Sequence, residues 1–212
     1  MKGSVPHAAD YLRMVKPNGT RLKAWGPIRR AVTAFGIVFC LVAGAIGIYC
    51  GALQLLGNVH VVVEQQFYRS AQLDKATLAR VIQEHGIKSI LNLMGTSPEK
   101  SWYVDEIAVS KALGAEHYDY GISANEVVTP DKIDQILKIV RDAPKPILVH
   151  CKNGADRSGL VAAIYLANLR GVIVDEAAGQ LSLYYGHFPW LTSGTGAMDE
   201  SFRIYEQRGQ KF

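Results

Sequence analysis

Residues 150–159 read HCKNGADRSG and begin at the end of a short apolar run, 146–150, that is typical of a buried strand. A helical pattern starts at about Ser158, so the segment joins a strand to the N-terminus of a helix. A loop in this position directs several backbone N–H groups toward one point, and the helix dipole adds positive potential. Gly154 permits a backbone turn that a Cβ atom would forbid. The segment therefore predicts an anion-binding loop.

Two side chains of this loop suit a covalent attack on phosphorus. Cys151 is the candidate nucleophile, because the loop amides and Arg157 favour its thiolate form. Arg157 returns to the loop mouth after five intervening residues, and its planar guanidinium can hold two oxygens of a phosphoryl group. A buried structural cysteine on a tight turn would not require glycine, arginine and serine at these spacings. The candidate substrate-binding residues are Lys152, Asn153, Gly154, Ala155, Asp156 and Arg157.

The segment resembles the HCxxGxxR[ST]G signature of the cysteine-dependent protein tyrosine and dual-specificity phosphatases. Residues 67–72 (FYRSAQ) also resemble the YRSxQ opening of small dual-specificity-like domains. Together these similarities cover nearly all of the chain after residue 58. The signature matches at all of its fixed positions, which are His150, Cys151, Gly154, Arg157, Ser158 and Gly159.

The resemblance implies a phosphoric monoester hydrolase that needs no metal or other cofactor. By this analogy, Cys151 attacks phosphorus and forms a phosphocysteine, while Arg157 and the loop amides hold the phosphoryl oxygens. Ser158 helps the thiolate to leave in the second step. His150 orders the loop by hydrogen bonding, and Gly159 is structural at the site.

The general acid that protonates the leaving oxygen has two candidates. In many small dual-specificity phosphatases the acid lies about thirty residues before the cysteine at a strand end, and Asp119 fits that description. Glu126 and Asp131 follow in the same region, where Asp131 complements the start of a helix. Asp156 is the competitor, because a carboxylate within an anion loop opposes the binding of a dianion unless it is protonated or paired.

Asp156 also bears on the substrate. An aspartate directly before the loop arginine resembles the myotubularin lipid phosphatases and certain bacterial tyrosine phosphatases with lipid activity. It would serve as the acid or bind substrate hydroxyls. Its structural alternative is a salt bridge with Lys152 or Arg69.

An uncharged stretch at residues 31–56 reads AVTAFGIVFCLVAGAIGIYCGALQLL. A helix of about 20 apolar residues spans the hydrocarbon core of a bilayer, so this segment predicts a membrane anchor. Residues 1–30 contain seven Lys or Arg and one Asp, and no Lys or Arg follows the segment before Arg69. The positive-inside rule then places the N-terminus in the cytoplasm and residues 58–212 across the membrane, in the periplasm if the source is bacterial.

The composition of the 212 residues fits this organisation. Hydrophobic residues make up 49% and charged residues 20%, which excludes a disordered chain. Three cysteines are too few for a disulfide scaffold, and no Cys/His cluster indicates structural zinc. The net charge of +4 arises in the tail, because the residues after 30 carry 16 basic and 18 acidic side chains. Nucleic-acid binding by the folded domain is therefore not expected.

These observations predict a basic tail (1–30), a transmembrane helix (31–56) and a catalytic domain (58–212) of dual-specificity phosphatase-like α/β fold. Alternating strands and helices favour a central, mostly parallel sheet flanked by helices. The expected partners are a phosphorylated protein, or alternatively a phospholipid headgroup such as a phosphoinositide or phosphatidylglycerophosphate, and the bilayer through 31–56. The third alternative is a phosphate-binding pseudophosphatase, which the intact Cys151, Arg157 and Ser158 disfavour.

Overall fold

The computed structural model describes residues 25–190 and 194–209 of the 212-residue chain. The chain divides into two compact units, one ending at Ile48 and the other starting at Tyr49. Most of the predicted basic tail lies outside the described residues. The domain boundaries at residues 30, 56 and 58 stay predictions.

Helix α1 (Trp25–Leu55) contains nearly all of the apolar segment, which the sequence predicts as a helix. An 18-residue window within Gly26–Leu55 has a mean hydropathy of 2.4, and none of that window is buried in the protein. By length and composition this helix can cross a membrane. The apolar helix of a signal sequence near an N-terminus shares these properties.

The second unit is built on a sheet with the strand order β1-β2-β5-β3-β4. Strand β1 pairs antiparallel with β2, and the other neighbouring pairs are parallel. This arrangement confirms the predicted α/β class with a mostly parallel sheet. The strands are β1 (His60–Val63), β2 (Phe67–Ser70), β3 (Ser89–Asn92), β4 (Glu116–Asp119) and β5 (Ile147–His150).

The four parallel strands end in one row across the sheet. Ser70 pairs with His150, His150 with Asn92, and Asn92 with Asp119. In open sheets of this kind, ligand sites form outside the carboxyl ends of the strands. The register therefore brings the loop after His150 and the end of β4 to the same edge.

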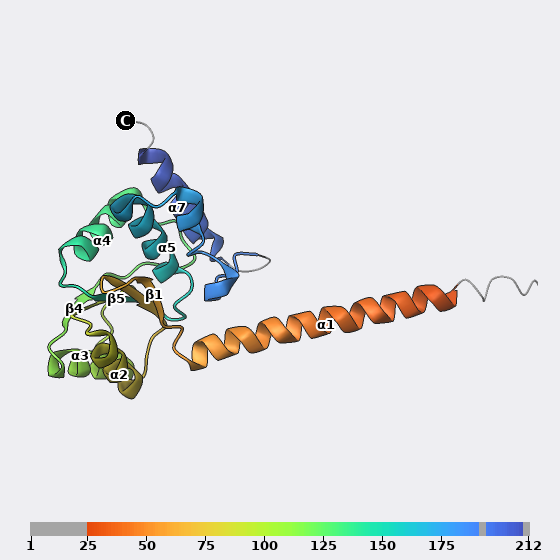
Figure 1. Ribbon diagram of the computed structural model, residues 1–212, viewed down its shortest axis with the longest axis horizontal. Helices are drawn as coiled ribbons and strands as arrows, with labels where there is room; N and C mark the ends of the chain where they lie inside the picture. The colour runs from red at the N-terminus through yellow and green to blue at the C-terminus, as the bar shows by residue number, and fades with distance from the viewer. Residues whose placement is uncertain (1–24, 191–193, 210–212) are drawn as a thin grey trace, which may run out of the picture. The chain divides into compact units, whose positions relative to one another are not determined.

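Helices cover both faces of the sheet (Figure 1). On one face, α2 (Lys75–His85) and α3 (Ser101–Ala112) pack against strand residues that include Tyr68, Ile90 and Leu148. The opposite face carries Phe67, Leu91 and Val149, which pack against the remaining helices. Alternation of strand side chains thus supplies two apolar layers. The helices of the second layer are α4 (Pro130–Asp142), α5 (Arg157–Ile164), α6 (Val174–Ala178) and α7 (Gly196–Gly209).

Local signals in the sequence place several helix ends correctly. The Asp74 carboxylate caps α2 by accepting from the backbone N–H groups of Ala76 and Thr77. Gly86 ends the same helix in the left-handed conformation, with φ of 61°. Pro130 begins α4 at the first helical position, which proline favours. The helical pattern that starts at about Ser158 begins one residue earlier, in α5, and passes into a π-helical turn, Tyr165–Leu169.

The sequence of residues 117–122 favours a strand, but β4 ends at Asp119, because the chain leaves the ladder there. The N–H groups of Tyr120 and Ile122 still donate to Asn92 O and Leu93 O. A Cβ on Gly121 would lie 3.3 Å from Gly95 Cα, so the two glycine backbones approach closely here. Residues 120–122 therefore lie against the end of β3, where Ile122 O also accepts from Arg157 Nη1 at the start of α5.

Candidate active site

Residues 151–156 form the predicted loop between β5 and the N-terminus of α5. Gly154 has φ of 68°, and a Cβ there would lie 2.5 Å from Ala71 N. The left-handed backbone and the lack of space both require glycine. The loop therefore turns tightly against the end of β2, and this contact fixes its path.

Cys151 begins this loop and is 1% exposed. Its Sγ lies 3.6 Å from the Oγ of Ser158, which is buried in the first turn of α5. This is within hydrogen-bonding range for sulfur, so the hydroxyl can donate to a thiolate at this position. Of the predicted binding residues, Lys152 and Asn153 are exposed, whereas Ala155 is buried.

Arg157 reaches from the first turn of α5 to the ends of neighbouring strands. Its Nη1 donates to Leu93 O at 3.4 Å and to Ile122 O at 3.3 Å. Its Nε is buried and has no hydrogen-bond partner among the described residues. Long bonds and an unused donor leave the guanidinium able to exchange its carbonyl partners for the oxygens of an anion.

Arg69 supports the loop from the interior, a role that the sequence reasoning did not assign. It is fully buried, and its Nη2 donates to Gly154 O and Ala155 O at 2.9 and 2.8 Å. Its Nη1 donates to Gln180 O and Oε1, and the guanidinium lies 4.2 Å from the ring centroid of Tyr185. Burial lowers the pKa of Arg69 to about 10, so the group stays charged at neutral pH. The FYRSAQ similarity was the available signal for this residue.

Gly159, which the resemblance implies is structural at the site, lies where a side chain would not fit. A Cβ at this position would lie 2.8 Å from Gln180 O and 2.9 Å from Arg69 Nη2. The glycine therefore leaves room for the bonds by which Arg69 holds the loop.

His150 contacts a buried carboxylate rather than the loop backbone. Its Nε2 lies 3.1 Å from Glu106 Oε1, and His117 Nε2 lies 2.8 Å from the same oxygen. Burial opposes ionisation of Glu106, but its hydrogen bonds with His117 and His150 outweigh burial and lower its pKa to about 2. Nothing in the sequence singled out Glu106, which directly follows Asp105 in α3.

Asp119 lies at the strand end where the sequence places it, two strands from His150. Two strand spacings correspond to about 10 Å, so a flexible carboxylate at this edge can approach the loop mouth. Its oxygens accept from Asn92 Nδ2 at 2.8 Å and from Tyr103 OH at 2.5 Å. His117 Nδ1 lies 3.7 Å away. Burial and this bond to Asp119 raise the pKa of Tyr103.

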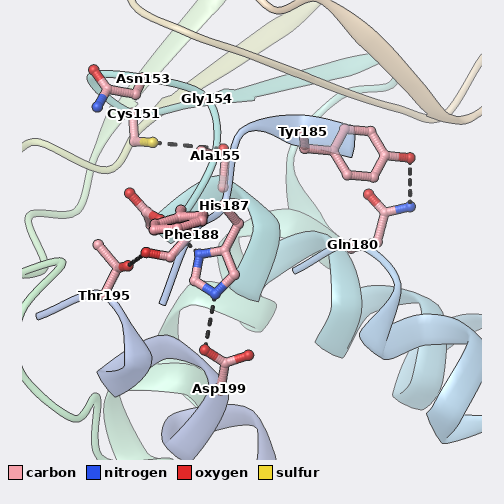
Figure 2. A network of polar contacts seen from close by, with 12 residues as sticks. Cys151, Asn153, Gly154, Ala155, Gln180, Tyr185, His187, Phe188, Thr195 and Asp199 are labelled. Carbon is pink, nitrogen blue, oxygen red and sulfur yellow. Dashed lines mark hydrogen bonds and ion pairs between the residues drawn. The ribbon is translucent and has the colours of Figure 1, made fainter. Parts of the chain in front are cut away.

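Asp156 is paired with His187, and not with Lys152 or Arg69 as its structural alternative supposed. The distance from Asp156 Oδ1 to His187 Nδ1 is 2.7 Å. The Nη1 and Nη2 atoms of Arg69 instead donate to backbone carbonyls and to Gln180. Figure 2 shows His187 between the loop and Asp199 of α7.

The end of α1 also contacts the loop. Gln54 Nε2 and Asn58 Nδ2 both donate to Asn153 O, at 3.0 and 2.9 Å. Asn58 Nδ2 lies 2.9 Å from Tyr185 O as well. The residues that precede β1 therefore hold one side of the loop, so a protein starting at residue 58 would lack the Gln54 bond.

The geometry is a thiol at the base of an anion loop, with an arginine at the mouth and a hydroxyl beside the sulfur. Residues 65–170 match the family model described as "Polymorphic toxin system, DSP-PTPase phosphatase", which is half of the chain. The chain belongs to this family. The DSP-PTPase match includes Arg69, Glu106 and Asp119, whereas Gln54 and His187 lie outside it.

Known proteins similar to this DSP-PTPase domain agree with the assignment. The chain is 28% identical over 99 residues to dual specificity protein phosphatase Mpk3 of Drosophila melanogaster. That alignment covers 47% of this chain and 23% of Mpk3, so the chain spans about a quarter of that relative.

Solved structures show the same fold. TpbA of P. aeruginosa has a TM-score of 0.56 at 20% identity, covering 72% of this chain and 87% of TpbA. Siw14 of S. cerevisiae has a TM-score of 0.54 at 21% identity, covering 73% and 94%. PTPMT1 has a TM-score of 0.53 at 17% identity, covering 73% and 99%. The predicted family and fold are thereby confirmed.

Proposed function

We propose that this DSP-PTPase domain hydrolyses phosphomonoesters through a phosphocysteine intermediate and that its substrates are phosphorylated proteins. The observation that carries the proposal is the 3.6 Å approach of Cys151 Sγ and Ser158 Oγ in a strand–loop–helix connection. Arg157, at the mouth of the same connection, supplies a charged donor for the phosphoryl oxygens. The pseudophosphatase alternative is disfavoured because the thiol, the hydroxyl and the guanidinium are all in place.

In the first step, the Cys151 thiolate attacks phosphorus and the bond from phosphorus to the leaving oxygen breaks. Loop N–H groups and Arg157 donate hydrogen bonds to the equatorial oxygens. Because these donors are already in place, they stabilise the negative charge of the transition state without rearrangement. The leaving oxygen takes a proton from a carboxylic acid. The products of this step are the free alcohol or phenol and phosphocysteine.

In the second step, water attacks phosphocysteine and the S–P bond breaks. The carboxylate formed in the first step accepts the proton of the water. Ser158 donates a hydrogen bond to the departing sulfur and so stabilises the thiolate. Inorganic phosphate leaves, and Cys151 is ready for another turnover.

We assign the acid to Asp119 rather than to Asp156. Asp119 lies at the carboxyl edge in register with His150, and its side chain is 19% exposed. Asp156 is held in an ion pair with His187. To act, Asp119 must exchange its bonds with Asn92 and Tyr103 for one with the leaving oxygen.

The acid assignment is tested with Asp119→Asn and Asp156→Asn in the full chain. Loss of a general acid lowers kcat by about 10²–10⁴-fold. We expect that loss for Asp119→Asn, together with disappearance of the alkaline limb of the kcat profile. The same loss confined to Asp156→Asn would move the acid to the loop.

We also propose that α1 anchors the domain in a membrane with residues 58–212 outside the cytoplasm. The support is the length and hydropathy of α1 and the basic residues that precede it. Fusion of a reporter after residue 60 tests the orientation. A reporter active only outside the cytoplasm fits the proposal, and one active only in the cytoplasm reverses it.

Phosphorylated lipid headgroups are the second candidate substrate. Gln54, near the end of α1, and Asn58, which follows α1, both donate to Asn153 O, so the chain that supports the loop directly continues the apolar segment of the proposed anchor. Similar folds occur in complexes with either kind of ligand, since TpbA was solved with pTyr and PTPMT1 with PI(5)P.

The two candidates are separated by assaying the full chain in detergent micelles. Phosphate release from a phosphotyrosine peptide is compared with release from phosphatidylglycerophosphate and phosphoinositides in mixed micelles. Cys151→Ser should abolish all release, whereas the matched variant Cys40→Ser, on α1, should retain it. Faster release from the peptide supports a protein phosphatase; faster release from lipids supports the second candidate. Activity of Cys151→Ser near that of the parent would refute the covalent mechanism.

A further inference from the structure

His187 connects the anion loop to the C-terminal helix through two carboxylates. Its Nδ1 lies 2.7 Å from Asp156 Oδ1, and its Nε2 lies 2.9 Å from Asp199 Oδ2 (Figure 2). The side chain of His187 is 0% exposed. A neutral imidazole has one N–H donor, so hydrogen bonds to both carboxylates require the doubly protonated ring.

The environment of His187 favours this charged form. Burial alone lowers the pKa of the imidazole, but the hydrogen bonds and charges of Asp156 and Asp199 outweigh burial and raise it above its usual value. Asp156 lies in the loop and Asp199 in the first turn of α7. The buried imidazolium is therefore compensated from both sides.

Asp156 poses an electrostatic problem for the loop. It directly precedes Arg157, within the segment whose N–H groups would surround a phosphoryl dianion. An unpaired carboxylate there repels the dianion and opposes the positive potential of Arg157 and the helix N-terminus. The side chain of Asp156 is 14% exposed, so water screens its charge only in part.

We propose that His187 is a positioning residue that neutralises Asp156 and holds its carboxylate toward α7, so that the loop can bind a phosphoryl dianion. Asp199 fixes the imidazolium from the other side. The inference rests on the proposed function, because the dianion is the phosphate of the substrate. It also gives the segment after residue 170, which the family match does not include, a part in the site.

The test measures the affinity of the full chain in detergent for inorganic phosphate, on a Cys151→Ser background that removes turnover. His187→Gln should weaken phosphate binding by about tenfold or more, since the carboxylate of Asp156 is then unpaired. Adding Asp156→Asn to His187→Gln should restore affinity close to that of the parent. Asp156→Asn alone should bind phosphate at least as tightly as the parent.

A merely structural role for His187 gives a different pattern. It would lower the thermal stability of His187→Gln without the rescue of phosphate affinity by Asp156→Asn, and that result overturns the proposal. If His187→Gln does not fold, the single variant Asp156→Asn tests the inference. Weaker phosphate binding by Asp156→Asn than by the parent would contradict it.

Turnover in the Cys151 protein gives a second readout. His187→Gln should raise KM for a phosphomonoester by a larger factor than it lowers kcat; the reverse would assign Asp156 and His187 to the chemical step. Absence of phosphate binding by the parent overturns the proposed function and this inference together. Binding by the parent with no change in any variant overturns the inference alone.

Discussion

The two sides of the anion loop differ in how their arginines are satisfied. At the mouth, Arg157 makes only two bonds, of 3.3 and 3.4 Å, to backbone carbonyls. In the interior, Arg69 makes four bonds of 2.8 to 2.9 Å and stacks on Tyr185. The guanidinium of Arg157 can therefore exchange its partners for a ligand, whereas that of Arg69 holds the loop backbone that the ligand would contact.

The largest effect is expected for Arg157→Lys, which tests whether Arg157 binds the phosphoryl group at the loop mouth. Lysine keeps the charge but loses the planar pair of donors. Loss of a preorganised donor to the transition state costs about 10²–10³-fold in kcat, and we expect kcat/KM to fall by at least that factor. Phosphomonoester kinetics measure this loss, and thermal unfolding should show little change. A large drop in Tm would mean that Arg157 is a structural group like Arg69.

The corresponding test of the interior is Arg69→Met. Removing the guanidinium leaves the carbonyls of Gly154 and Ala155 buried without their donor, at a cost of about 1–3 kcal/mol for each group. We expect the free energy of unfolding to fall by about 3 kcal/mol, with loss of activity following from the disordered loop. Denaturant titration measures the change. Unchanged stability with lost activity would mean that Arg69, like Arg157, acts on the ligand rather than on the loop backbone.

The ionised Glu106 beside His150 makes the free energy of unfolding depend on pH in the acid range. The pKa of Glu106 is about 2 in the folded protein against an ordinary 4.5, so the unfolded chain takes up the proton first. Its contribution to stability is present above about pH 4.5 and is lost as the pH falls toward 2. Denaturant titrations between pH 6 and 2 should show a smaller loss for Glu106→Gln than for the parent. Glu99→Gln, at an exposed position, is the matched control. An equal pH response of all three proteins would show that Glu106 does not stabilise the fold through its ionised form.

The smallest effect is expected for Gln54→Ala. Its bond to Asn153 O is duplicated by Asn58, so the loss should be about 0.5–1.5 kcal/mol or less in unfolding free energy. Asn58→Ala removes bonds to both Asn153 O and Tyr185 O and should cost more. Denaturant titration of the full chain compares the two. A larger loss for Gln54→Ala would make the end of α1 a principal support of the loop.

Much of the fold is readable from local patterns in the chain. The Asp74 cap, the Gly86 stop, the Pro130 start and the apolar run before His150 each depend on neighbours within a few residues. Secondary structure that rests on such short-range physics is predictable. By contrast, β4 ends three residues before its strand-favouring pattern does, at Asp119 rather than Ile122, and the close approach of Gly121 to Gly95 there is a contact between distant segments.

The sequence by itself determined the contiguous part of the site: the loop, its Gly154 turn, and the order of Cys151, Arg157 and Ser158. Those groups act through a backbone path of a few residues, so their spacing carries the chemistry. Only the tertiary structure decided the supports: Arg69 behind the loop, Glu106 beside His150, and His187 between Asp156 and Asp199. Each support comes from a segment far away in the chain, because a charge in a partly buried loop is stabilised by whichever groups the fold places within hydrogen-bonding distance.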